Sequence, residues 1–254
     1  MNLIRILNID VLSIGKVELL QELKEGVVYT PNIDHLVKLQ SSRSFYNAYK
    51  EADWVICDSR ILYLFSKLLP FSIKEAIPGS SFFPAYYYHH RDNPDVRIFL
   101  LGAGEGVAVK AMHNVNEKVH KRLVVGAHSP SFGFEKNEQE CQLIVDMINK
   151  SSATVLVVGV GAPKQEIWIH KHKGQLPKIH TFMALGATID FEANNIVRAP
   201  RFFQQSGLEW LFRLLKEPRR LWKRYLIEDL SFFLYFWKQL RGKYVDPFRD
   251  SFVG

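Results

Sequence analysis

Six short apolar runs alternate with longer amphipathic segments, and this alternation is the feature that most constrains the fold. The runs are apolar at consecutive positions, which is typical of strands buried on both faces. The segments between them carry apolar residues at helical spacing. Strand alternating with helix predicts a Rossmann-like α/β fold, with a parallel sheet and helices on both of its faces. The predicted strands are residues 26–30, 54–57, 96–102, 122–127, 154–159 and 179–186.

The strand pattern ends near residue 199, and only helical patterns follow it. We therefore expect a core over residues 1–197 and a helical C-terminal appendage over residues 198–254. The appendage contains 12 Lys and Arg against 6 Asp and Glu, so it carries +6 of the net charge of +7. It also contains three of the five tryptophans. A basic, aromatic appendage on a nearly neutral core predicts contact with a polyanion or a membrane surface.

The remaining composition predicts a cytoplasmic protein. The first residues lack the apolar stretch and cleavage site of a secretory signal, and no 18 consecutive residues are apolar. Cys57 and Cys141 provide neither a disulfide framework nor a zinc-ligand spacing. The nine histidines show no HExxH or similar spacing, so we expect no metal site.

Polar side chains follow the first two predicted strands, at the edge where an open parallel sheet binds its ligands. Asp58 comes directly after the second strand, where it can act as a general base or cap the helix expected over residues 60–69. Thr30 and Asn32 follow the first strand. They can hydrogen-bond to sugar or phosphate oxygens, or cap the helix expected over residues 33–40.

Two glycine-containing turns, GAGEG and GVGAPKQE, connect predicted strands to predicted helices. Their backbone amides can approach a diphosphate at a helix N-terminus, although turning and capping alone explain such residues about as well. Neither turn has the spacing of a P-loop or of a complete dinucleotide fingerprint. An aspartate after the last strand can hold a ribose hydroxyl or cap a turn. These candidate binding residues are Gly102, Gly104, Gly161, Pro163, Lys164 and Asp190.

Basic residues recur in the appendage at intervals of three or four, at Arg213, Lys216, Arg220 and Arg224. If one helix continues through Pro218, these side chains share one face. Such a face is either simply solvated or binds phosphate groups through its guanidinium groups. The aromatic segment over residues 226–243 is too short to span a bilayer and predicts a helix that lies in the membrane interface.

Five features occur in a recognisable order: TPNIDH (30–35), the aspartate after the second strand, GVGAPKQE (159–166), RAPRF (198–202) and GLEWLFRLLKEPRR (207–220). Together they resemble the WecG/TagA/CpsF family of bacterial glycosyltransferases. The resemblance covers roughly residues 2–224, and its GAPKQE and GLEW blocks are quite specific.

The resemblance implies an inverting, metal-independent transfer from a UDP-sugar to a polyprenyl-diphosphate-linked saccharide in bacterial cell-surface polysaccharide synthesis. It implies a peripheral protein on the inner face of the cell membrane, without a cofactor or a nucleic-acid partner. Apolar surface on the core also fits a homo-oligomer. The family's base aspartate falls on Asp58, and its TPN residues fall on Thr30 and Asn32. Its glutamine falls on Gln165, near the transferred sugar, with Lys164 near the diphosphate. The arginines expected to contact the acceptor or the diphosphate are Arg198, Arg213, Arg220 and Arg224.

The chain departs from the family pattern at two places. Ser59 stands where the family usually has Gly, and Gly79-Ser80-Ser81 stands where it usually has Gly-x-Asp. The second change removes a carboxylate near the expected site, which bears on donor preference. Two rival functions remain from the residues alone. One is a non-catalytic module that binds a nucleotide or nucleic acid, and the other is a nicotinamide enzyme that uses GAGEG.

Overall fold

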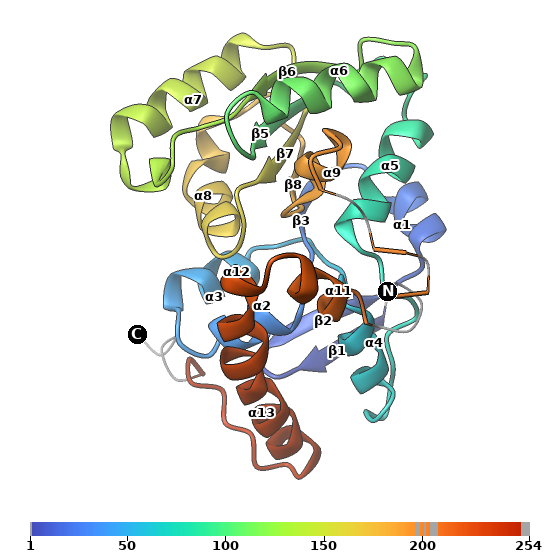
Figure 1. The fold of residues 1–254 in the computed structure, drawn as a ribbon, viewed down its shortest axis with the longest axis vertical. Helices are drawn as coiled ribbons and strands as arrows, with labels where there is room; N and C mark the ends of the chain where they lie inside the picture. The colour runs from blue at the N-terminus through green and yellow to red at the C-terminus, as the bar shows by residue number, and fades with distance from the viewer. Residues whose placement is uncertain (1, 197–198, 201, 204–207, 250–254) are drawn as a thin grey trace.

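The computed structural model describes residues 2–196, 199–200, 202–203 and 208–249, without the side chains of Arg213 and Arg220. Its centre is a parallel sheet of six strands in the order β4-β3-β8-β7-β5-β6 (Figure 1). Each strand falls within or next to a predicted apolar run, so the predicted α/β class is confirmed. The strands are β3 (Gly26–Tyr29), β4 (Trp54–Val55), β5 (Ile98–Gly102), β6 (Val124–His128), β7 (Val155–Gly159) and β8 (Thr181–Ala184).

Helices cover both faces of this sheet, because successive side chains of each strand point to opposite sides. Tyr29 and Val158 belong to one buried apolar cluster, whereas Val28 and Val157 belong to the other. The first cluster includes α2 (Ile33–Lys38), α3 (Arg43–Lys50), α7 (Glu138–Lys150) and α8 (Lys164–His172). The second includes α1 (Lys16–Glu22), α5 (Gly79–His89) and α6 (Val107–Val119).

An antiparallel hairpin precedes the sheet, and the sequence patterns did not predict it. It consists of β1 (Asn2–Ile6) and β2 (Ile9–Ser13). Leu12 forms a parallel bridge with Ile56, which places β2 beside the β4 edge of the sheet. The hairpin therefore extends the core beside β4, the outermost strand, which Asp58 follows in the sequence.

The appendage is helical, as predicted, and it forms two helices around Pro218 rather than one. They are α11 (Glu209–Lys216) and α12 (Pro218–Lys223), and Pro218 occupies the first turn of α12. Proline has no N–H and its ring clashes with the preceding turn, so it starts a helix more readily than it continues one. Arg213 and Arg220 thus lie on different helices, so the condition for a single arginine face, one helix continuing through Pro218, is not met.

A π-helical turn (Arg224–Glu228) leads from α12 into α13 (Leu230–Leu240), which packs on the core with one face. Phe232 and Phe236 are buried against Phe65 of α4 (Arg60–Ser66). Gln239 accepts a hydrogen bond from the Leu7 backbone N–H at 2.8 Å, which joins the helix to the hairpin. The appendage is therefore anchored to the core by apolar packing as well as by polar contacts.

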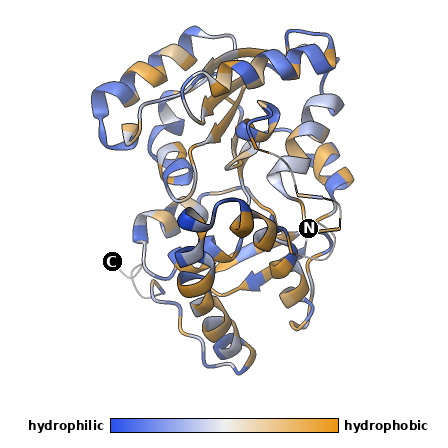
Figure 2. Cartoon of the chain, viewed as in Figure 1, coloured by the Kyte–Doolittle hydropathy of each residue, from blue (hydrophilic) through white to orange (hydrophobic). Residues whose placement is uncertain are grey.

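The opposite face of this C-terminal segment is apolar and exposed, and much of α13 is coloured as hydrophobic in Figure 2. Trp222 and Trp237 are 49% and 50% exposed. Within the described ranges, no helix is long and apolar enough to cross a membrane. We call the following residues the exposed apolar stripe: Trp222, Leu226, Ile227, Leu230, Phe233, Leu234, Trp237 and Leu240.

Candidate active site

The two glycine-containing turns lie side by side at the carboxyl edge of the sheet. Gly102 pairs with Gly159 across β5 and β7, and the Ala103 N–H donates to the Gly159 carbonyl at 3.1 Å. Gly102 has a φ of +140°, and a Cβ built on it would lie 2.4 Å from the Gly159 oxygen. A larger residue would separate the two turns, so this position requires glycine.

Gly102→Ala is expected to lower the free energy of unfolding by about 2 kcal/mol or more, because the new methyl group overlaps the Gly159 backbone and the φ value is strained. Urea denaturation followed by circular dichroism would measure the loss. Gly106→Ala is the matched control in the same turn. Gly106 also has a positive φ (+72°), but its added Cβ would meet nothing within 4 Å. Equal losses in the two variants would show that the contact with Gly159 does not matter.

Thr30, Asn32 and Asp58 gather at the neighbouring strand ends. The Thr30 hydroxyl donates to the Ala184 carbonyl of β8 at 3.3 Å. The Asp58 N–H donates to the Pro31 carbonyl at 3.1 Å, so Asp58 lies directly beside the TPN turn. The Asn32 side chain accepts from the His35 N–H, which confirms its expected role as the N-cap of α2.

Asp58 does not cap the helix that follows it, so that interpretation of the sequence is wrong. Ser59 is the N-cap of α4, and its hydroxyl accepts from the Leu62 N–H at 3.3 Å. Asp58 Oδ1 instead accepts from the Gly79 N–H at 2.8 Å, at the start of α5. This bond orients the carboxylate from a segment 21 residues further along the chain. The two positions where the chain departs from the family pattern therefore flank Asp58.

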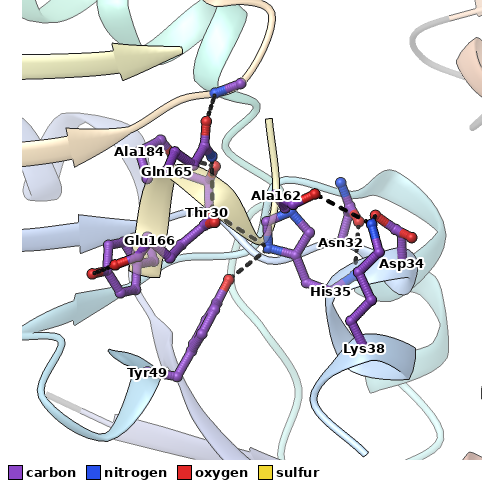
Figure 3. Close-up of polar contacts among 12 residues, drawn as sticks. Thr30, Asn32, Asp34, His35, Lys38, Tyr49, Ala162, Gln165, Glu166 and Ala184 are labelled. Carbon is purple, nitrogen blue, oxygen red and sulfur yellow. Dashed lines mark hydrogen bonds and ion pairs between the residues drawn. The ribbon is translucent and has the colours of Figure 1, made fainter. Parts of the chain in front are cut away.

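Gln165 connects two turns of this edge (Figure 3). Its side chain is buried, and its Oε1 accepts from the Gly161 N–H and from the Gly186 N–H, each at 3.2 Å. Its Nε2 donates to Glu166 Oε1 at 2.8 Å. Gln165 thus holds the turn after β7 against the turn after β8, in addition to the substrate role expected from the family.

Glu166 is fully buried behind Gln165, and burial raises the pKa of its carboxyl to about 7. Its Oε1 is 3.9 Å from His35 Nδ1, which lies 2.7 Å from the Tyr49 hydroxyl. Burial lowers the pKa of His35 to about 3, so the imidazole is neutral at physiological pH. Burial also raises the pKa of the Tyr49 hydroxyl. The imidazole of His35 and the phenol of Tyr49 are therefore uncharged at physiological pH.

The other candidate residues of the glycine-containing turns also lie at the carboxyl ends of the strands. Lys164 Nζ is 3.2 Å from Glu135 Oε1 and 4.6 Å from the centre of the Phe132 ring. The lysine thus faces the loop after β6. Pro163 precedes α8 after a cis peptide bond, and Gly161 has a φ of +83°. Gly104 is exposed in the turn after β5, and Asp190 is half-buried in the first turn of α9 (Thr188–Glu192).

The appendage reaches the site through Arg224. Its Nη2 is 3.5 Å from Asn32 Oδ1 and 3.4 Å from Asp34 Oδ2. Asp34 also accepts from Lys38 Nζ at 2.8 Å, and the same Nζ donates to the Ala162 carbonyl at 3.3 Å. Burial raises the pKa of Asp229, next to Arg224, to about 7. These contacts join the appendage, α2 and the turn after β7.

Three of the four appendage arginines named from the sequence cannot be placed in the site. Arg198 lies outside the described residues, and so do the side chains of Arg213 and Arg220. Conversely, sequence patterns overlooked Asp34, Lys38 and Glu166. The i, i+4 spacing of Asp34 and Lys38 was an available signal. Among the described residues, no group of three His, Cys, Asp or Glu side chains is arranged to hold a metal ion.

The fold and the site define a Rossmann-like α/β protein with a polar, glycine-rich cluster at the carboxyl edge of its sheet. The chain belongs to the WecG/TagA/CpsF family of glycosyl transferases, whose sequence profile matches residues 4–246. It is similar to an N-acetylglucosaminyldiphosphoundecaprenol N-acetyl-beta-D-mannosaminyltransferase of Bacillus spizizenii, with 28% identity over 207 residues. That alignment covers 82% of this chain and 77% of the relative. The protein is therefore a glycosyltransferase, which excludes the nicotinamide enzyme and favours catalysis over simple binding.

Proposed function

We propose that this glycosyltransferase moves a sugar, with inversion and without a metal ion, from a UDP-sugar to a polyprenyl-diphosphate-linked saccharide. The name of the Bacillus relative supports this acceptor class, because it describes transfer to a sugar carried on undecaprenyl diphosphate. The pathway that we infer is the synthesis of a bacterial cell-surface polysaccharide. The donor is an N-acetylhexosamine or hexose nucleotide.

The observation that carries the proposal is the position of Asp58 beside the TPN turn. A general base must meet the acceptor hydroxyl in a fixed orientation, and the Gly79 N–H and the adjacent Pro31 carbonyl hold Asp58 in place. In the proposed reaction, the acceptor oxygen bonds to the anomeric carbon while the bond from that carbon to the UDP oxygen breaks. The hydroxyl proton passes to Asp58, and UDP leaves with the bonding electron pair.

The leaving diphosphate gains negative charge, which the site can offset with backbone amides and cations. We place it near the turns that contain Gly102, Gly104 and Gly161, with Lys164 at their edge. Preorganised N–H groups and cations stabilise such charge more strongly than water does. Thr30 and Asn32 are placed to hydrogen-bond substrate oxygens, and Asp190 to bind a ribose hydroxyl. Arg224 beside Asn32 supports a role for the appendage in completing the site.

The exposed apolar stripe provides the proposed contact with the membrane. A lipid-linked acceptor stays in the bilayer, so the enzyme has to work at the bilayer surface. Lys223, Lys238 and Arg241 are exposed on the same segment, and cations beside an apolar face favour anionic lipid. This arrangement supports a peripheral enzyme on the inner face of the cell membrane.

A panel of UDP-sugars tests the donor class and the metal requirement together. We expect one or more UDP-sugars to raise the melting temperature, and the same compounds to support transfer to a lipid-linked acceptor in excess EDTA. The physical reason is that backbone amides and cations replace the Mg²⁺ or Mn²⁺ that would otherwise bind the diphosphate. The measurement is release of UDP with and without EDTA. Loss of activity that Mn²⁺ restores would show that the diphosphate site uses a metal ion.

A further inference from the structure

Glu166 has no assigned task in the transfer reaction, although it is the most deeply buried acid near the site. None of its surface is exposed, and it is adjacent in sequence to Gln165. Within the described part of the chain, its Oε2 has no hydrogen-bond partner. Burying a carboxyl oxygen without a hydrogen-bond partner costs free energy of folding. Titratable groups in such unfavourable environments are concentrated at functional sites. The contacts of Glu166 indicate its structural role in the site.

The side-chain amide of Gln165 has one oxygen and one nitrogen, and its partners distinguish them. Two backbone N–H groups, of Gly161 and Gly186, meet one end and require an acceptor there. The Glu166 carboxyl meets the other end and accepts from Nε2. If the amide were rotated by half a turn, its NH2 group would face two N–H donors. The Glu166 acceptor and the two N–H groups therefore favour the same orientation of the amide, the one that joins the two turns.

Glu166 is anchored through its backbone, and a neutral imidazole lies near its carboxyl. Tyr29 donates through its hydroxyl to the Glu166 backbone carbonyl at 3.0 Å. The neutral His35 lies 3.9 Å from Oε1, and its Nδ1 is 2.7 Å from the Tyr49 hydroxyl. A protonated carboxyl keeps one oxygen that accepts hydrogen bonds, so the bond from Gln165 does not require ionisation. The pKa of about 7 is consistent with this uncharged environment.

We propose that Glu166 is a positioning residue for donor binding, which fixes the Gln165 amide so that the turns after β7 and β8 are held together. The inference rests on the proposed function only for its donor, a UDP-sugar. Glu166 itself touches neither substrate, because Gln165 lies between it and the turns. Its effect on the reaction passes through Gln165, and this dependence makes the proposal testable.

Glu166→Met removes the acceptor and keeps the length of the side chain. We expect the KM for the UDP-sugar to rise about tenfold, in the range of one lost hydrogen bond to a charged or partly charged group. The KM for the acceptor should stay within about twofold. Glu166→Gln is the matched control, because its carbonyl oxygen can still accept from Gln165, and its KM for the donor should stay near that of the wild type. A general loss of stability would not separate the two KM values.

A double-mutant cycle tests whether Glu166 acts through Gln165. In a Gln165→Met background, the added Glu166→Met change should not raise the donor KM further. Multiplicative effects would overturn the proposal, and so would a donor KM unchanged in Glu166→Met. If Glu166→Met does not fold, Glu166→Asp serves instead. It retracts the carboxyl by one methylene, keeps the acid, and should raise the donor KM about threefold.

A measurement that needs no substrate keeps this inference separate from the proposed function. The amide NMR signals of Gly161 and Gly186 report the two hydrogen bonds to Gln165. Both signals should move in Glu166→Met and stay in place in Glu166→Gln. Unmoved signals in Glu166→Met would overturn the positioning role, whatever the donor is. Failure of wild-type protein to use any UDP-sugar, with the expected signal shifts present, would instead count against the proposed function alone.

Discussion

Asp58→Asn is expected to lower kcat by about 100-fold or more, the contribution typical of a general base. Asparagine has almost the same shape and can still accept the Gly79 N–H through Oδ1. It cannot take the proton from the acceptor hydroxyl. Binding of the UDP-sugar, measured by calorimetry, should be nearly unchanged. Near-normal turnover in this variant would exclude Asp58 as the base.

The neighbouring Ser59 offers a control for this substitution. Ser59→Ala removes the N-cap of α4, which should cost about 1 kcal/mol of stability. Its kcat should stay within about threefold of the wild-type value, since the hydroxyl is used for capping. A 100-fold effect in Asp58→Asn alone would then be a chemical effect, because the control disturbs the same turn without removing the carboxylate.

Replacing Trp222 and Trp237 together with glutamine is expected to weaken binding to anionic liposomes by about 30-fold. Both side chains are half exposed on the exposed apolar stripe, so the change removes apolar surface without opening the core. Turnover of a soluble, short-chain acceptor should stay near normal. Liposome co-sedimentation beside a soluble-acceptor assay measures the two effects separately.

Substituting the two tryptophans tests the membrane contact more specifically than deleting the C-terminal segment would. Deleting residues 225–254 would also remove Phe232 and Phe236 from the core and uncover Phe65. The matched control is Leu143→Gln with Met147→Gln on α7, where two exposed apolar residues lie outside the appendage. Equal liposome binding by the wild type and the tryptophan variant would rule out the membrane role of the stripe.

The sequence predicted the main sheet well because its strands are buried on both faces. Runs such as residues 155–158 (VLVV) are apolar at every position, and this pattern has few alternative explanations. The hairpin was missed because its two strands are only partly buried and carry polar residues among the apolar ones. No bounds were predicted for helix α5, because Pro84 lies inside it and its aromatic residues show little helical periodicity. Both elements depend on packing against segments that are distant in the sequence.

The candidate site was predicted in part, and its errors have a common cause. The sequence named Asp58 and Asn32 as candidates because each follows a strand that ends at the same edge, and the family resemblance added Gln165. The sequence patterns offered Asp58 as a possible cap of α4, whereas the cap is Ser59, one residue nearer the helix. The choice depended on Gly79, which donates to Asp58 from another helix. Glu166 was overlooked because its acceptor role exists only once Gln165 is folded against Gly186.

The sequence by itself determined the α/β class, the edge of the sheet where the candidate residues gather, and the glycosyltransferase family. Periodicity records which side chains avoid water, and motifs record which residue types occur together. Neither records which distant partner a side chain meets. Tertiary structure alone decided the strand order, the orientation of Gln165, the contact of Arg224 with Asn32 and the buried face of α13. Arg224 and Asn32 are 192 residues apart, so only the packing of the whole chain brings them together.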